Sequence, residues 1–169
     1  MNKDIKLKNF LKECISDGLL SLMRTKKFDK ISVEEICAKS GVSRATFYRN
    51  FKKKEQAVSF KLIILWERYT ELHNLKVRND YDVNNALDFF TFNLEIKDIL
   101  NIIYACGLQS ALYSAFYEIM MPKSRENTTK RYCNRFYSYG LFGLLDEWIQ
   151  NGYNETPAQM AEFMLKHLK

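Results

Sequence analysis

The hydrophobic and polar positions along this 169-residue chain follow a helical period almost throughout. Apolar side chains recur at spacings of three and four residues, which places them on one face of a helix. The chain contains no sustained alternation of apolar and polar residues of the kind that predicts a β-strand. We therefore expect an all-α fold of about nine helices, over roughly Asp4–Arg24, Ser32–Ser40, Arg44–Asn50, Lys53–Leu75, Asp82–Asn93, Ile96–Cys106, Leu108–Met121, Thr128–Asn151 and a last helix from Pro157.

The segment 31–55 contains the clearest local signals. Ser32 followed by Glu35 forms a capping box, which predicts the start of a short helix. Gly41 can adopt a positive φ and end that helix, and Ser43 can cap the next one. A helix, a glycine-containing turn and a second helix predict a helix-turn-helix, whose second helix enters the DNA major groove. A plain helical hairpin inside an all-helical domain fits the same pattern.

This segment resembles the DNA-binding signature of the TetR/AcrR family of bacterial transcription regulators. The positions that match are Ile36, Gly41, Val42, Ser43, Thr46, Tyr48, Phe51 and Lys54. Cys37 and Ser40 stand where the family usually has alanine, and Lys53 stands where a capping residue often begins the next helix. The resemblance implies a three-helix DNA-binding domain at 1–58, with its motif at about 32–51. It also implies that the fourth helix joins this part to an effector-binding and dimerisation domain at 59–169.

The DNA-facing residues follow from this assignment. Arg44 can form a bidentate hydrogen bond with guanine, and the methyl group of Thr46 can contact the methyl group of thymine. We therefore expect both residues at base edges. Polar and basic neighbours are expected to hold phosphates and set the register. The complete predicted DNA-binding set is Ser32, Ser43, Arg44, Thr46, Tyr48, Arg49 and Lys54.

The charge of the chain is concentrated around this motif. Residues 1–56 hold 14 Lys and Arg against 7 Asp and Glu, a net charge of +7, while the rest of the chain has a net charge of −1. Contacts to phosphates supply much of the affinity of DNA-binding proteins. A solvated basic face is the alternative, but the coincidence with the motif favours a DNA-facing region.

The stretch 139–149 is apolar on most sides of its helix, and Gly140 and Gly143 would let another helix approach closely. This pattern suggests a homodimer, and the resemblance implies that the last two helices pair into an intersubunit four-helix bundle. A monomeric core is the alternative. The predicted interface residues are Tyr139, Gly140, Phe142, Gly143, Leu144, Trp148, Met160, Phe163 and Met164.

Aromatic residues are frequent in the second part of the chain. Family members often enclose a small apolar effector there, so the resemblance implies such a pocket. Its candidate residues are Trp66, Phe89, Tyr104, Gln109, Tyr113, Phe116 and Phe136. A filled core, with tyrosine hydroxyls bonded internally or to water, fits the composition equally well.

The sequence gives little support for an enzyme, a metal-binding protein or a membrane protein. His73 and His167 are the two histidines, and neither lies beside a paired carboxylate or a nucleophile, so we expect no enzyme and no catalytic residues. The four cysteines are widely spaced, which argues against a metal site, and no cofactor motif is present. The N-terminus lacks the apolar core of a signal peptide, and the most apolar stretch, 99–121, contains polar residues. We expect a bacterial cytoplasmic protein that does not bind membranes.

The sequence therefore predicts a DNA-binding transcriptional regulator. The resemblance favours a repressor that binds a pseudo-palindromic operator in double-stranded DNA as a homodimer and is released by a small apolar effector. The alternative is a helical protein-interaction module, or a coactivator of the same family, whose bundle binds a protein partner.

Overall fold

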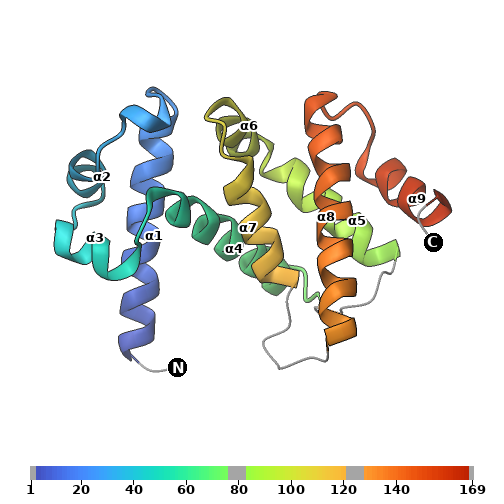
Figure 1. The fold of residues 1–169 in the computed structure, drawn as a ribbon, viewed down its shortest axis with the longest axis horizontal. Helices are drawn as coiled ribbons and strands as arrows, with labels where there is room; N and C mark the ends of the chain where they lie inside the picture. The colour runs from blue at the N-terminus through green and yellow to red at the C-terminus, as the bar shows by residue number, and fades with distance from the viewer. Residues whose placement is uncertain (1–2, 76–82, 121–127, 168–169) are drawn as a thin grey trace. The chain divides into compact units, whose positions relative to one another are not determined.

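The computed structural model describes residues 3–75, 83–120 and 128–167, and its elements within these ranges are all helical (Figure 1). The predicted all-α fold is confirmed. The helix start predicted at Asp82 and the helix end predicted at Met121 lie outside the described residues. The elements are α1 (Lys3–Met23), the short 3₁₀ helix η1 (Phe28–Lys30), α2 (Val33–Ser40), α3 (Arg44–Asn50), α4 (Lys54–Leu72), α5 (Val83–Glu95), α6 (Lys97–Ala105), α7 (Gln109–Met120), α8 (Thr128–Gln150) and α9 (Pro157–His167).

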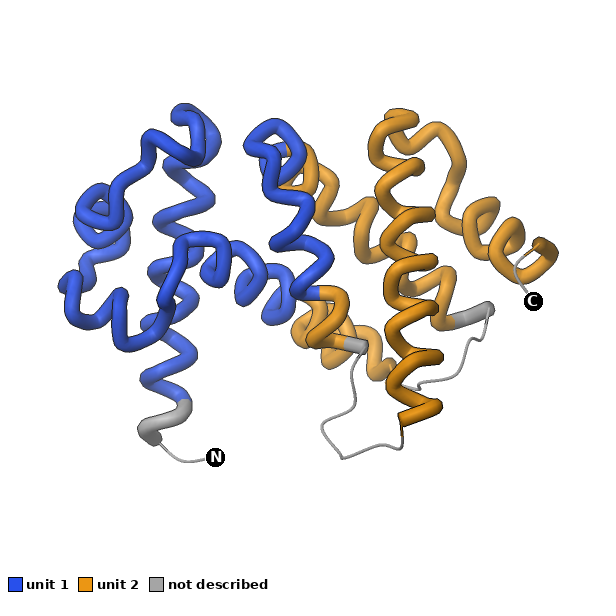
Figure 2. The backbone as a smooth tube through the Cα atoms, viewed as in Figure 1, with its two compact units in different colours: residues 1–65, 102–115 blue, residues 66–101, 116–169 orange. Residues whose placement is uncertain are grey.

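The chain divides into two compact units, coloured separately in Figure 2. Unit 1 comprises residues 1–65 and 102–115, and unit 2 comprises residues 66–101 and 116–169. The divisions fall inside α4, α6 and α7, so these helices contribute residues to both units. The domain boundary expected after residue 58 stays a prediction.

In unit 1, α1 packs against α2 and α3. Ile15, Leu19, Ile36 and Phe47 are fully buried between these helices. Gly18 lies at a close approach of α1 to α2, because a Cβ there would stand 3.1 Å from the Cβ of Ser40. Burial of these apolar side chains supplies the main free energy that holds the three short elements together.

An ionic cluster ties α4 to α1 within unit 1. The ammonium of Lys61 lies 3.3 Å from a carboxylate oxygen of Glu13 and 2.7 Å from one of Asp17. Lys61 is buried, and a buried ammonium is costly unless it is paired. Two residues before Lys61 on α4, the hydroxyl of Ser59 donates to the carbonyl of Ala111 in α7 at 2.8 Å.

The core of unit 2 is built from aromatic side chains. The ring of Phe90 on α5 meets that of Trp148 on α8 edge to face, with centroids 5.4 Å apart. Helix α9 packs against α5. Its start has a capping box, in which Gln159 N–H donates to the Thr156 hydroxyl and Thr156 N–H donates to the Gln159 side chain.

Candidate nucleic-acid interface

Two hydrogen-bonded caps and a glycine turn build the α2–turn–α3 segment. The Ser32 hydroxyl accepts from Glu35 N–H at 3.2 Å, and the Glu35 carboxylate accepts from Ser32 N–H at 2.9 Å, so the predicted capping box is present. Gly41 has φ 69°, a left-handed conformation that glycine adopts without a steric penalty. Ser43 then caps α3 by accepting from Thr46 N–H at 3.1 Å. These local bonds fix the direction in which α3 leaves the turn.

Helix α3 is anchored on one side and exposed on the other. Phe47 is fully buried, and its ring packs against Phe51 with centroids 6.2 Å apart. Arg44, Tyr48 and Arg49 are exposed to solvent. The helix therefore presents two cations and a phenol outward from a fixed base.

The guanidinium of Arg44 is held by a neighbouring carboxylate. Its Nη1 atom lies 2.8 Å from Oε1 of Glu34 on α2, and the two side chains are 63 and 56% exposed. Exposed ion pairs of this kind contribute about 0–1 kcal/mol, so DNA could displace Glu34 at small cost.

A second carboxylate, Glu35, is stabilised in its charged form. Lys26 donates to it at 2.6 Å, and this hydrogen bond, together with that from Ser32 N–H, lowers the pKa of Glu35 to about 2. Next to it on α2, burial and the charge of Glu34 raise the pKa of the Cys37 thiol. Cys37 is thus a buried thiol of the small core, without the environment of a reactive cysteine.

Lys54, which the sequence assigned to a phosphate, makes internal contacts in the structure. Its ammonium donates to the carbonyls of Phe28 at 2.8 Å and Ile31 at 2.6 Å. The same ammonium lies 4.4 Å from the centre of the Phe28 ring. Lys54 therefore joins the start of α4 to the segment that precedes α2, and its role at a phosphate stays a prediction.

Lys52 and Lys53 are exposed beside an open depression between α3 and α4, which Tyr48 and Phe47 also line. The side-chain carbonyl of Gln56 accepts from the backbone N–H groups of Lys52 at 2.7 Å and Lys53 at 3.3 Å. These two hydrogen bonds cap the start of α4, where the sequence has Lys53 in place of a usual capping residue. The two lysines were missed as candidate phosphate contacts, although the basic run 52–54 was the signal that could have identified them.

The remaining predicted DNA-facing residues lie together on this part of unit 1. Thr46 is half-buried, and its hydroxyl lies 3.0 Å from that of Ser43 and 3.4 Å from Nη2 of Arg49. Ser32 is half-buried at the α2 cap. Ser43, Thr46 and Arg49 therefore lie close together at α3, whereas Ser32 caps the preceding helix, α2.

The predicted effector residues are distributed over both units. Phe89 and Phe116 are buried in unit 2 with ring centroids 5.0 Å apart, and Trp66 stacks on Tyr69. Phe136 is 75% exposed on α8, away from the packed rings. The half-buried members that belong to unit 1 are Tyr104, Gln109 and Tyr113. A pocket formed by this set stays a prediction.

The predicted interface residues fall into two groups. Trp148 and Met160 are buried within the chain itself, and Trp148 Nε1–H donates to the carbonyl of Glu155 at 2.9 Å. The group exposed at the surface comprises Tyr139, Gly140, Gly143 and Phe163. The half-buried ones are Phe142, Leu144 and Met164. The roles of both groups in a dimer stay predictions.

In the described ranges, no group of three or more His, Cys, Asp or Glu residues could hold a metal ion. None of the helices described is both long and apolar enough to cross a membrane.

Two protein-family models match the chain. Residues 15–58 match the model described as bacterial regulatory proteins, tetR family, and this range includes the last part of α1, all of α2 and α3, and the start of α4. Residues 84–169 match the model described as transcriptional regulator C-terminal region, which covers half of the chain. The comparison of this chain with curated proteins found no match.

Proposed function

Since this chain belongs to the tetR family of bacterial regulatory proteins and is a DNA-binding regulator of transcription, we propose that it is a repressor that binds its operator through α3 as a homodimer. The observation that carries the proposal is the exposed face of α3. Arg44 and Arg49 point to solvent from a helix whose Phe47 is fully buried. A helix fixed on its base with donors outward suits the major groove.

Arg44 and Thr46 are the residues we assign to base edges. Arg44 has a long donor side chain near the start of α3, where recognition helices contact bases. Its partner Glu34 is exposed and holds it by a surface ion pair, which phosphate and base oxygens can replace.

Phosphate contacts are assigned to Ser43, Tyr48 and Arg49, with Lys52 and Lys53 added from their exposure beside Tyr48. Such contacts fix the register of the protein on the duplex without reading the sequence. They account for the concentration of positive charge in residues 1–56.

A homodimer would carry two α3 helices related by a two-fold axis. We propose that they read half-sites about 34–36 Å apart, or a multiple of that spacing, so the operator is a pseudo-palindrome. Release by a small apolar effector is part of the same proposal. Its support is family membership and the frequency of aromatic residues between Trp66 and Phe116.

Equilibrium binding to DNA that flanks the protein's own gene tests the proposal. Wild-type protein is expected to bind one fragment far more tightly than random DNA, with an affinity that falls as salt rises. Arg44→Ala should lose about 1–3 kcal/mol of discrimination at one base position. Lys97→Ala, which removes one exposed charge from α6, is the matched control. Equal binding to all fragments, or unaltered base preference in Arg44→Ala, would contradict the assignment.

A further inference from the structure

Glu34 places a carboxylate beside the exposed face of α3. Its Oε1 atom lies 2.8 Å from Nη1 of Arg44, and its side chain is 56% exposed. Within the described residues, Arg44 is the cation with which Glu34 pairs. The carboxylate therefore lies where the side chain that we assign to a base edge meets solvent.

The neighbouring carboxylate of Glu35 has a different place in the same turn of α2. It accepts from Lys26 at 2.6 Å and from Ser32 N–H at 2.9 Å, and all three residues belong to unit 1. Glu35 thus completes the capping box of α2. The cap does not use Glu34, whose charge is directed at α3 instead.

A carboxylate on a surface that meets DNA needs a hydrogen-bond donor, because the phosphates carry the same charge. In the major groove, guanine presents two acceptors and thymine presents an acceptor beside a methyl group. Cytosine presents its N4 amino group, which is a donor. Adenine also presents an amino group, but the acceptor N7 lies next to it and repels a carboxylate. Of the four bases, cytosine therefore suits a carboxylate best.

Binding of Arg44 to guanine would release the carboxylate of Glu34. Two N–H donors of the guanidinium then go to the O6 and N7 atoms of the guanine. The exposed ion pair is weak enough for this exchange. The released carboxylate still lies beside the guanidinium, which covers the edge of the guanine pair. It therefore faces the adjacent base pair, one step of about 3.4 Å along the duplex.

We propose, on the premise put forward above that α3 enters the major groove, that Glu34 is a specificity-determining residue, which accepts a hydrogen bond from the N4 amino group of a cytosine next to the guanine bound by Arg44. The two residues then read a step of two base pairs as one unit. Guanine or thymine in place of the cytosine sets an acceptor against the carboxylate, so affinity for such sites falls. Glu34 thus raises selectivity while its charge lowers the overall affinity for DNA.

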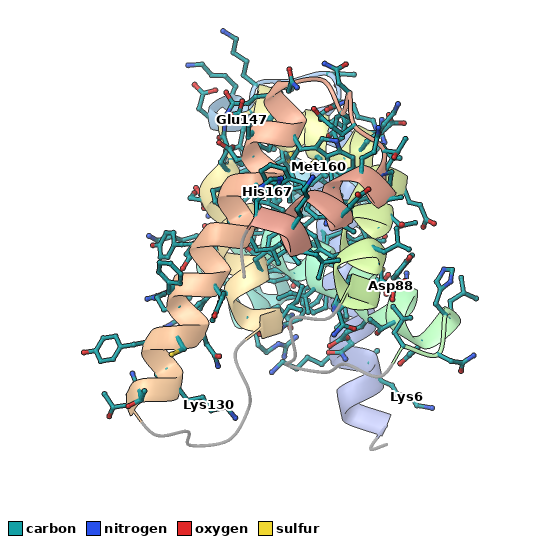
Figure 3. All side chains as sticks on the ribbon, turned by 90° about the vertical axis from the view of Figure 1, so that its right-hand side faces the viewer. Lys6, Asp88, Lys130, Glu147, Met160 and His167 are labelled. Atoms are coloured by element: carbon teal, nitrogen blue, oxygen red, sulfur yellow. The ribbon has the colours of Figure 1, made fainter. Side chains whose placement is uncertain are left out.

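Selection of binding sites from a library of random duplexes tests the assignment. Full-length wild type should enrich a half-site in which a cytosine adjoins the guanine whose preference is lost in Arg44→Ala. Glu34→Gln should enrich the same guanine with a relaxed preference at the cytosine, since an amide can donate or accept. Glu147→Gln removes the same charge from an exposed position on α8, labelled in Figure 3, and should leave both preferences unchanged.

Affinities for two matched duplexes give the size of the effect. One carries the enriched site. The other has deoxyuridine in place of the cytosine and adenine in place of its partner guanine, which exchanges the N4 donor for an O4 acceptor without adding a methyl group. Wild type should bind the second duplex at least about fivefold more weakly than the first. Glu34→Gln should bind the two duplexes within about twofold of each other, because its amide suits both bases.

The outcomes separate this inference from the function on which it rests. A cytosine preference that is present in the wild type and relaxed in Glu34→Gln supports the inference. A wild-type site without that cytosine, or an unchanged cytosine preference in Glu34→Gln, overturns it and leaves the assignment of Arg44 intact. Loss of the guanine preference in Glu34→Gln also overturns it, since Glu34 would then only position Arg44. Enrichment of no site by the wild type overturns the proposed function as well.

Discussion

Glu34 and Arg44 form an exposed ion pair beside the helix that we assign to the DNA major groove. The pair joins α2 to α3 at 2.8 Å, and both side chains are exposed. Glu34 holds the guanidinium that we assign to a base edge, and it also places a negative charge beside a polyanion. Both effects oppose DNA binding.

We therefore expect Glu34→Gln to bind DNA more tightly, by up to about fivefold, since exposed ion pairs contribute no more than about 1 kcal/mol. Glu162→Gln removes the same charge from an exposed position on α9 and is the control. Fluorescence anisotropy at one salt concentration measures both variants. An equal gain in the two variants would assign the effect to net charge, and a loss in Glu34→Gln would indicate that Glu34 orients Arg44 for binding.

Glu35 predicts a pH dependence of stability. Hydrogen bonds from Lys26 and Ser32 N–H lower its pKa from 4.5 to about 2, so the folded state binds fewer protons there than the unfolded state. Its contribution is present above the unfolded pKa and is lost as the pH falls towards 2. The difference in melting temperature between wild type and Glu35→Gln should thus be largest above pH 5 and shrink below pH 4. A difference that stays constant from pH 7 to pH 2.5 would show that the charge is unimportant.

At the scale of elements, the caps were readable from the sequence because each involves residues close along the chain. The Ser32–Glu35 box and Gly41 at the end of α2 appear as predicted, and α9 begins with a box of the same kind, formed by Thr156 and Gln159. Their hydrogen bonds depend on local backbone geometry alone.

Contacts between distant segments were not readable in the same way. The ammonium of Lys54 bonds carbonyls that lie 23 and 26 residues earlier, which no local pattern encodes. In α8 the apolar residues cover most of the helix, so the pattern alone did not distinguish the buried Trp148 from the exposed Phe136. Which residues of α8 are covered depends on tertiary packing, as where Phe90 of α5 meets Trp148.

Lys54 joins the start of α4 to the segment before α2, so its removal should affect folding more than DNA affinity. We expect Lys54→Ala to lower the free energy of unfolding by about 1–3 kcal/mol, because two carbonyls lose a charged donor. Lys53→Ala, at an exposed position, should change stability by less than about 0.5 kcal/mol. Urea unfolding of both variants measures the difference.

The salt dependence of DNA affinity should also differ between the Lys53 and Lys54 variants. Lys53→Ala should reduce the slope of affinity against salt by about one phosphate contact, and Lys54→Ala should leave that slope unchanged. The opposite pattern would return Lys54 to the phosphate-binding role that the sequence suggested.

At the scale of the whole molecule, positive charge and the helix-turn-helix occupy the same third of the chain. In the homodimer that we propose, each copy would supply one α3, and the pairing of two copies would supply the symmetry of the DNA site.

The most direct test of this account is selection of binding sites from a library of long random DNA duplexes. Wild-type protein and the control Lys97→Ala/Lys166→Ala, which removes two exposed lysines from unit 2, should both enrich one pseudo-palindrome. Its half-sites should lie about one helical turn apart or a multiple of that. Arg44→Ala/Arg49→Ala, which loses the same charge from α3, should enrich none. Enrichment of the same site by that variant, or of no site by the wild type, would contradict recognition of DNA through α3.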